Sequence, residues 1–268
     1  MKRFVFAISM LMVTGCMVGE DALSYEEFKK QAVLEPDTGI YIMNGDEIIE
    51  TEEAMFSIYQ LYLESHYKAI DDGYATIEQG LIVNRVGNSD DKWSASAALN
   101  ITYCISQSSF GSRYNTMVTA MNSATGAWEA AGRVNFVHVS SQDGNCTNRN
   151  NNVVFNVRQV NTNQYLARAF FPSSSRKGRE ILVASSSFGN INPWSLTGVM
   201  RHELGHTLGF RHEHTRPDSG VCFENNQWRA LTTYDSASVM HYPQCNGTNN
   251  GDLVLTTRDK SGTGILYP

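Results

Sequence analysis

Five of the seven histidines of this sequence fall in its last third, and three of them have the spacing of metal ligands. His202 and His206 stand four residues apart, so on a helix they lie nearly on one face and can reach one ion. Glu203 lies beside them, where it can take a proton from metal-bound water without being a ligand. Gly209 can adopt the left-handed conformation that ends a helix, and the returning chain would bring His212 as a third nitrogen ligand.

Three protein nitrogens with one open position are typical of a catalytic zinc, whereas a structural zinc is usually closed by four ligands. The sequence therefore predicts one catalytic Zn2+ ion as the cofactor, with Glu203 as the general base. The competing interpretation is a helix that carries scattered histidines. Gly209 and His212, both at the required distance, argue against it.

The segment from His202 to His212 resembles the extended zinc motif of the metzincin metallopeptidases. Glu213 follows the third histidine, which makes the segment most similar to the astacin branch. The resemblance is strong from Val199 to Tyr242 and looser elsewhere. It implies a zincin fold of the α+β class: a twisted mixed β-sheet with a backing helix and an active-site helix, then a small irregular C-terminal subdomain.

Downstream, Ser238-Val-Met-His-Tyr242 resembles the astacin Met-turn. The resemblance implies that Met240 packs beneath the metal, and that Tyr242 is a fifth metal ligand that swings to stabilise the tetrahedral intermediate. Outside such a motif, Met240 would be a core residue and Tyr242 a packed aromatic. The stretch from Cys222 to Cys245 is not astacin-like and resembles a group of secreted bacterial metallopeptidases with a compact tail.

The expected reaction is the hydrolysis of peptide bonds in a protein or peptide substrate. Glu203 would move the proton, and Tyr242 would hydrogen-bond the developing oxyanion. We expect extended substrate to pair with a sheet edge at residues 181–184. Two competing functions are a zinc-containing cell-wall peptide hydrolase and a low-turnover zinc-binding toxin or binding protein. Glu203 argues against the low-turnover protein, because a structural site does not need that carboxylate.

A second motif lies far upstream, at Asn44-Gly45-Asp46. It resembles the astacin propeptide motif, in which an aspartate occupies the position of the catalytic water. A carboxylate oxygen is an acceptable zinc ligand, so Asp46 would bind the metal in the zymogen only. The alternative is an Asn-Gly hairpin turn with an exposed aspartate.

The charge of the chain is divided between two regions. Residues 17–87 hold 15 acidic against 4 basic side chains, whereas residues 88–268 hold 12 acidic against 15 basic ones. We therefore predict an acidic inhibitory propeptide over residues 17–87 and a metallopeptidase catalytic domain over residues 88–268. The basic excess of the second region is too diffuse to indicate nucleic-acid binding, and we expect a monomer.

The first residues have the pattern of an export signal. Lys2 and Arg3 precede an apolar run from Phe4 to Val13, which predicts a signal peptide over residues 1–16. The run is too short to cross a bilayer as a helix, which needs about 20 residues. Cys16 ends a segment that resembles a bacterial lipobox, so we predict its lipidation; ordinary signal cleavage is the alternative. The protein would be exported, either secreted or lipid-anchored at the bacterial cell envelope before processing.

The remaining cysteines, Cys104, Cys146, Cys222 and Cys245, form an even set that permits three disulfide pairings. We favour Cys104 with Cys146 and Cys222 with Cys245. The second bond would close the loop that carries the Met-turn and fix Tyr242 relative to the zinc helix. A zinc-binding cysteine pair is the alternative, and no Cys-x-x-Cys spacing supports it.

Local patterns predict the elements that must position these residues. Ser24 and Glu27 form a capping box that opens a helix to about Leu34, Thr51 opens a second helix, and residues 41–49 are extended. Farther on we expect strands at 99–105, 134–139, 152–158 and 180–185, a helix at 112–131, and the zinc helix from Ser195 or Thr197. Gly262 and Gly264 weaken any helix near the end of the chain.

Overall fold

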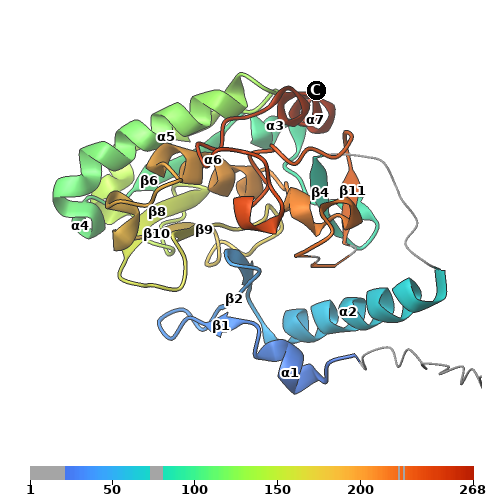
Figure 1. The fold of residues 1–268 in the computed structure, drawn as a ribbon. Helices are drawn as coiled ribbons and strands as arrows, with labels where there is room; N and C mark the ends of the chain where they lie inside the picture. The colour runs from blue at the N-terminus through green and yellow to red at the C-terminus, as the bar shows by residue number, and fades with distance from the viewer. Residues whose placement is uncertain (1–21, 73–80, 223, 226) are drawn as a thin grey trace, which may run out of the picture.

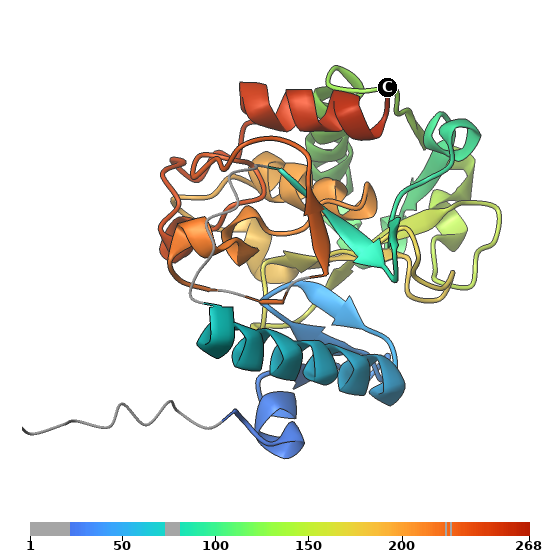
Figure 2. The ribbon, with the colours of Figure 1, turned by 90° about the vertical axis from the view of Figure 1, so that its right-hand side faces the viewer.

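The computed structural model describes residues 22–72, 81–222, 224–225 and 227–268. Residues 22–72 form a small N-terminal layer, which packs along one side of the larger unit that begins at Leu81 (Figures 1 and 2). The predicted signal peptide and the predicted lipidation of Cys16 lie outside the described residues. Within the described ranges, no helix has both the length and the apolar character that spanning a membrane requires.

A five-stranded mixed sheet is the centre of the larger unit, which confirms the predicted α+β class. Its strands, in spatial order, are β7 (Phe136–His138), β6 (Ile101–Ile105), β8 (Phe155–Val160), β10 (Glu180–Ala184) and β9 (Ala167–Arg168). Neighbouring strands are parallel except β9, which runs antiparallel to β10. The sheet therefore ends, on the β10 side, in one short antiparallel strand.

The prediction that residues 181–184 form the edge of the sheet is wrong. They belong to β10, which lies between β8 and β9, and all five side chains of the strand are buried. A continuous apolar run is typical of a strand covered on both faces, which is a property of central strands. The outer strand is β9, which consists of only two residues and gave no recognisable pattern in the sequence.

Two helices pack together against the sheet. The predicted helix at 112–131 is α5 (Tyr114–Glu129), whose Met117, Met121 and Trp128 are buried as expected. It contacts α6 (Leu196–Thr207), the zinc helix, and the Trp128 indole donates a hydrogen bond of 2.8 Å to the Arg201 carbonyl. The backing helix thus fixes the position of the helix that carries the histidines (Figure 1).

A helix also forms at the end of the chain despite its glycines. Helix α7 runs from Thr257 to Leu266, over the glycines expected to weaken it, and begins with a capping box of Thr256 and Asp259. A Cβ placed on Gly262 would come within 2.7 Å of the Leu81 side chain. The glycine therefore permits close packing that offsets its poor helix propensity.

A second sheet joins the start of the larger unit to its C-terminal part. It contains β11 (Trp228–Ala230), β4 (Ile82–Val86) and β5 (Ser89–Asp90), in that order. Leu81, Ile82 and Val83 have no exposed surface. Strand β4 thus packs with the larger unit, although it precedes the predicted domain boundary after residue 87, which itself stays a prediction.

The N-terminal layer consists of α1 (Tyr25–Lys29), β1 (Val33–Leu34), β2 (Tyr41–Met43), β3 (Glu47–Ile49) and α2 (Glu52–Asp72). The predicted capping box of Ser24 and Glu27 is present. The first helix ends at Lys29 instead of near Leu34, because Val33 and Leu34 pair with β2. The β-branched Val33 is better suited to such a ladder than to a helix.

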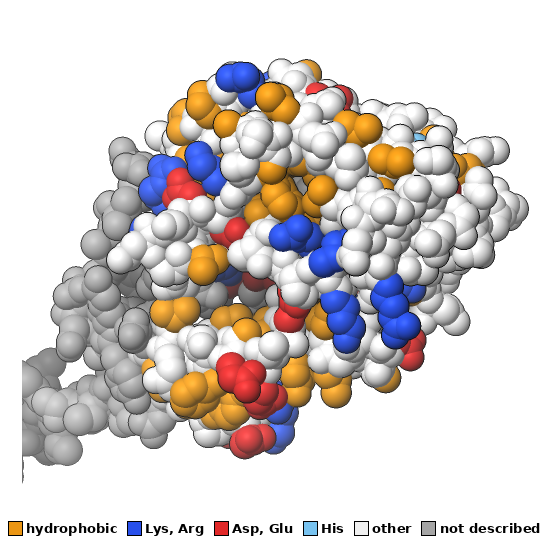
Figure 3. Space-filling view, turned by 180° about the vertical axis from the view of Figure 1, so that it is seen from behind, with side chains coloured by type: hydrophobic (Ala, Val, Ile, Leu, Met, Phe, Trp, Pro, Cys, Tyr) orange, Lys and Arg blue, Asp and Glu red, His pale blue; other side chains and the backbone are white. Residues whose placement is uncertain are grey.

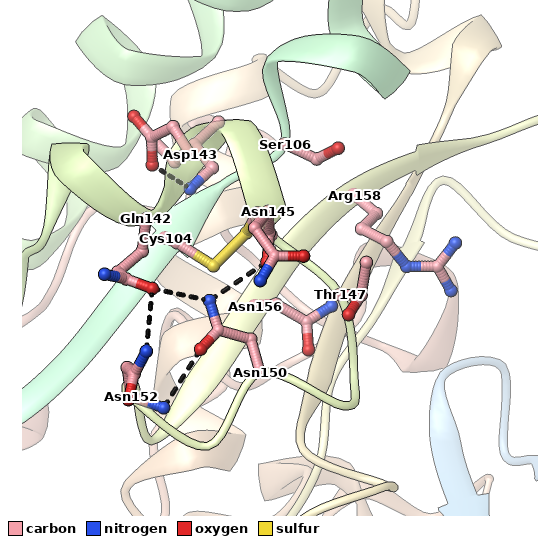
Figure 4. The surroundings of a disulfide bond; sticks show 12 residues. Cys104, Ser106, Gln142, Asp143, Asn145, Thr147, Asn150, Asn152, Asn156 and Arg158 are labelled. Carbon is pink, nitrogen blue, oxygen red and sulfur yellow. Dashed lines mark hydrogen bonds between the residues drawn. A yellow bond between two sulfur atoms is a disulfide. The ribbon is translucent and has the colours of Figure 1, made fainter.

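Short helices and two disulfides complete the larger unit. They are α3 (Ala95–Ala98), α4 (Gln107–Phe110) and the 3-10 helices η1 (Gly111–Arg113), η2 (Ser140–Asn145), η3 (Ser185–Phe188), η4 (Glu213–Thr215), η5 (Pro217–Ser219) and η6 (Pro243–Cys245). Cys104 bonds to Cys146, and Cys222 bonds to Cys245, which is the favoured pairing. Figure 4 shows the first bond, which ties β6 to the loop after η2 beside hydrogen-bonded Gln142 and Asn150.

Candidate active site

Helix α6 begins and ends where its sequence dictates. The Ser195 hydroxyl accepts a 3.0 Å hydrogen bond from the Gly198 amide and caps the first turn. At the other end Gly209 has a φ of 97°, and a Cβ there would collide with the carbonyl oxygen of Asp91. Glycine is therefore required at this turn. The turn sends the chain back so that His212 faces His202 and His206.

The three histidines direct ring nitrogens to one point. The Nδ1 atoms of His202 and His206 lie 2.7 and 2.8 Å from the carbonyl oxygens of Val239 and Phe210. A carbonyl oxygen only accepts, so both rings donate from Nδ1, and Nε2 is the ring nitrogen left to bind a metal. The Nε2 atoms of His202 and His212 are 3.2 Å apart. Two nitrogens bound to one tetrahedral zinc would be about 3.3 Å apart.

Asp46 of the N-terminal layer reaches the same point. Its carboxylate oxygens lie 3.3 Å from Nε2 of His202, 3.6 Å from that of His206 and 3.0 Å from that of His212. Yet neither Asp46 Oδ1 nor His206 Nε2 has a hydrogen-bond partner in the described part of the chain, although both atoms are buried. Close approach without hydrogen bonding is expected of ligands around one cation. These donors fit a zinc ion.

The turn that carries Asp46 fits closely into the site. Asn44 and Gly45 have φ angles of 57° and 99°, as an Asn-Gly hairpin turn requires. A Cβ on Gly45 would lie 3.0 Å from the Tyr242 hydroxyl oxygen. That hydroxyl donates a 2.6 Å hydrogen bond to Asp46 Oδ2. The turn is therefore an Asn-Gly hairpin, as in the alternative interpretation, but Asp46 is buried and not exposed as that interpretation expected.

Glu203 is buried beside the histidines. Its Oε2 atom has no hydrogen-bond partner among the described residues. Burial raises the pKa of Glu203 well above its ordinary value, and the Asp46 carboxylate raises it further. The side chain is thus a proton-accepting group held in a low-dielectric site, with one oxygen free to bind a small molecule or a proton.

The Met-turn supports the histidines from below. Met240 is fully buried, and a Cβ on Gly205 of α6 would collide with its sulfur. Asp259 of α7 holds the turn by accepting hydrogen bonds from the Ser238 hydroxyl, at 2.6 Å, and from the Val239 amide, at 2.9 Å. Val239 in turn accepts the hydrogen bond from His202. Asp259 was not singled out in the sequence, and its only local signal is the capping box with Thr256.

Glu224 is a second residue that sequence reasoning missed. Its Oε1 atom lies 2.6 Å from Nδ1 of His212, and its Oε2 atom accepts a 2.6 Å hydrogen bond from Arg211. A carboxylate on the far nitrogen of a ligating histidine fixes the ring and increases its basicity. Glu224 lies two residues after Cys222, so the disulfide to Cys245 restrains the loop that presents it. Nothing in the local sequence indicates its partner.

A cavity of about 500 Å3 opens beside these residues. Its lining includes His202, Glu203 and Tyr242 on one side and Tyr165, Leu166 and Ala167, from the segment around β9, on the other. The roles predicted for the site residues remain predictions, but the structure brings every one of the predicted ligands together with Glu203 and Tyr242. Glu213 does not join these residues, because its buried carboxylate accepts a 3.0 Å hydrogen bond from the backbone amide of Asp235.

Comparison with known proteins places this site in a family. The matrixin family model matches residues 92–227. Blastula protease 10 of Paracentrotus lividus is 36% identical over 81 residues, which cover 23% of this chain and 14% of that protein. Tolloid-like protein 2 of Mus musculus is 38% identical over 87 residues, 24% of this chain and 8% of that protein.

Zinc metalloproteinase nas-30 of Caenorhabditis elegans is 32% identical over 89 residues, which cover 26% of this chain and 12% of that protein. The chain thus spans only a small part of the length of these astacin-like relatives. The matrixin match, by contrast, covers just over half of the 268 residues and includes the zinc helix and His212. The chain therefore belongs to the matrixin family of the metzincin metallopeptidases.

Proposed function

We propose that this protein is an exported zinc-dependent endopeptidase made as a zymogen, in which the N-terminal layer blocks the active site. The main support is the convergence of three histidine nitrogens on the buried Asp46 carboxylate, next to the unpartnered oxygen of Glu203. His202, His206 and His212 would hold one Zn2+ ion. When bound, zinc supplies Lewis acidity that polarises a carbonyl group and acidifies water.

The residues of this chain would then move the proton and stabilise charge. Glu203 removes a proton from the attacking water and returns it to the leaving amine. With Asp46 gone, the Glu203 pKa loses one of the influences that raise it, which favours the ionised carboxylate that can accept a proton. The Tyr242 hydroxyl donates its hydrogen bond to Asp46 in the precursor, and after removal of Asp46 it can donate to the developing oxyanion.

Strand β9 would bind the substrate backbone. It is the outer strand on the β10 side of the sheet, and its neighbours Tyr165 and Leu166 line the cavity that reaches Glu203. An extended peptide can add to such an edge by main-chain hydrogen bonds. This geometry presents a peptide bond alongside the histidines and supports an endopeptidase that acts on protein or peptide substrates.

The inhibitory role of Asp46 is part of the same proposal. Each carboxylate oxygen of Glu47, the next residue, accepts a 3.3 Å hydrogen bond from Arg211, and this pair anchors the turn beside His212. Activation would remove this layer. Since β4 packs within the larger unit, we place the processing point before Leu81 rather than after residue 87. The resemblance to the astacin branch implies that Glu213 binds the new amino terminus; an ordinary surface ion pair is the alternative.

Export and lipidation remain proposals drawn from the first sixteen residues. If Cys16 is lipidated, removal of the N-terminal layer would also release the enzyme from the membrane. N-terminal sequencing of the active form, together with cell fractionation, tests this coupling. Processed enzyme that stays with the membrane fraction would contradict it.

The catalytic proposal is tested with the full-length chain, assayed for casein cleavage before and after limited proteolysis. The wild type should gain activity on processing and contain one zinc per chain. Glu203→Ala should bind the same amount of zinc without cleaving casein. Equal cleavage by both processed proteins would eliminate the mechanism, and zinc without cleavage in either would favour a low-turnover zinc-binding protein.

A further inference from the structure

Arg168 of β9 is a wholly buried cation whose partner comes from the N-terminal layer. Its Nε and Nη2 atoms donate hydrogen bonds of 3.0 and 2.6 Å to the two carboxylate oxygens of Glu35. The Tyr165 hydroxyl donates to the same carboxylate. Two side chains of the larger unit thus bind one carboxylate in the forked geometry that arginine favours.

No carboxylate of the larger unit is hydrogen-bonded to this arginine among the described residues. Glu180 and Glu203 both act on it electrostatically, but hydrogen bonds from Asn156 and Arg158 already occupy the Glu180 carboxylate. Arg168 Nη1 has no hydrogen-bond partner in the described ranges. Removal of Glu35 therefore leaves a guanidinium without a carboxylate partner, which is costly in a desolvated place.

Arg211 is a second buried arginine, and it has a carboxylate partner within the larger unit. It also contacts the N-terminal layer, through Glu47, but it keeps hydrogen bonds of 2.6 Å to both Asn225 and Glu224 in the larger unit. Loss of the layer leaves Arg211 paired. Arg168 is different because its carboxylate partner leaves with the layer, so a binding site for an acid opens there.

This site is continuous with the active-site cavity. Tyr165 lines the cavity that contains Glu203 and also contacts the carboxylate bound by Arg168. Ala167 and Arg168 form the outer strand, along which an extended peptide would lie. Side chains of such a peptide alternate between two faces of the sheet, so every second one would lie on the face that carries the Arg168 side chain.

We propose that Arg168 and Tyr165 form a subsite for an acidic side chain, so the processed enzyme prefers a glutamate or aspartate near the scissile bond. Glu35 holds that position in the precursor. The inference rests on the proposed endopeptidase function, because it assigns a substrate preference to the same cleft. The competing explanation is that Arg168 serves only to dock the N-terminal layer.

The test compares peptides that differ only by Glu or Gln at one position, scanned on both sides of the cleaved bond. The full-length protein is processed by limited proteolysis, and kcat/KM is measured for each peptide pair. The wild type should prefer Glu at one position by about tenfold or more, the usual scale of a charged hydrogen-bonded pair. Arg168→Gln should remove the preference, and Tyr165→Phe should reduce it.

Two further variants make the outcome decisive. Arg168→Gln leaves Glu35 buried without its partner, so the double variant Glu35→Gln/Arg168→Gln provides a precursor with both charges removed. Arg229→Gln is the matched control, because Arg229 pairs with Asp90 on an exposed surface, and it should keep the wild-type preference. Arg168→Glu should instead favour Lys at the same position.

Each result has one meaning. If the wild type cleaves none of the peptides and no casein, the proposed function fails. If it cleaves them with equal kcat/KM for Glu and Gln at every position, or if Arg168→Gln and the double variant keep the preference, the subsite is rejected and Arg168 only docks the N-terminal layer.

Discussion

The N-terminal layer and the larger unit are stabilised in different ways. The layer has a small apolar cluster of its own, in which Phe28, Met43, Ile49 and Met55 are buried. The larger unit has one extensive core that runs from the sheet through α5, α6 and the Met-turn to α7. Burial of apolar area is the main source of folding stability, so the larger unit should be far more stable than the layer. The layer depends on its contacts with the larger unit.

Those contacts rely on carboxylates. Glu35 binds Arg168, Asp46 meets the histidines, Glu47 meets Arg211, and Glu50 accepts a 2.9 Å hydrogen bond from the Ser175 amide. Figure 3 shows acidic side chains on the layer and basic side chains on the larger unit above it. Surface charge contributes little to stability, but these particular acids are directed into specific sites. The acidity of residues 17–87 is therefore partly a docking device.

The contrast between the N-terminal layer and the larger unit predicts that all catalytic groups lie in the larger unit. The variant Glu203→Ala is the strongest test of this prediction. A general base contributes about 10²- to 10⁴-fold to the rate, so kcat should fall by that amount in the processed protein. Zinc content and thermal stability should match the wild type, because Glu203 is not a ligand. Measured casein cleavage within threefold of the wild type, roughly 0.7 kcal/mol, would show that another group is the base.

The separate stability of the larger unit can be reduced without altering the layer. Replacing both Cys104 and Cys146 by serine removes a bond between residues 42 apart in the sequence. We expect unfolding of the larger unit to become easier by about 3–4 kcal/mol in the loop-entropy model. Denaturant unfolding followed by tryptophan fluorescence measures this, since the layer contains no tryptophan. Unchanged unfolding would mean that the disulfide adds nothing to the core.

Glu224→Gln alters the site while leaving the layer in place. The amide cannot increase the basicity of His212 as a carboxylate does, so zinc affinity should fall by about 10- to 100-fold. Competition with a chelator measures the affinity in the processed protein. Asp218→Asn is a suitable control, because Asp218 is a partly exposed acid of the same C-terminal region that contacts Arg216. Equal affinities for Glu224→Gln and wild type would rule out a role for Glu224 at His212.

Motif resemblance placed Asp46 at the zinc site, and the favoured disulfide pairing was also correct. The other parts of the molecule that sequence could predict are those that depend on nearby residues. His202, His206 and Gly209 belong to one helix and its end, so helical periodicity and a glycine locate them. The parts that sequence missed are held by distant partners. Glu35 and Arg168 are 133 residues apart, and β9 is too short to show alternation. Glu224 meets His212 only because the loop closed by the Cys222 disulfide folds back.

The smallest effect expected concerns the pH dependence of the layer. Burial alone would raise the pKa of Glu35, but the hydrogen bonds and charge of Arg168 outweigh it, and the net shift is downward. A lowered carboxylate pKa means that the pair stabilises docking above the ordinary value of about 4.5. That contribution is lost as the pH falls through the lowered pKa. The Glu35→Gln variant should therefore dock its N-terminal layer more weakly at neutral pH. Acidification should then change this docking less than in the wild type.

Amide hydrogen exchange in β1 and β2 of the full-length chain measures this docking directly, separately from any cleavage. Between neutral pH and about pH 3, Glu35→Gln should show a smaller change in protection than the wild type, after correction for intrinsic exchange. Asp46 is another carboxylate by which the layer docks, so some pH dependence should remain in the variant. Glu53→Gln, an exposed acid of α2, should behave as the wild type. If Glu35→Gln matches the wild type at every pH, Glu35 does not help to dock the layer, and the docking carboxylates would be Asp46, Glu47 and Glu50.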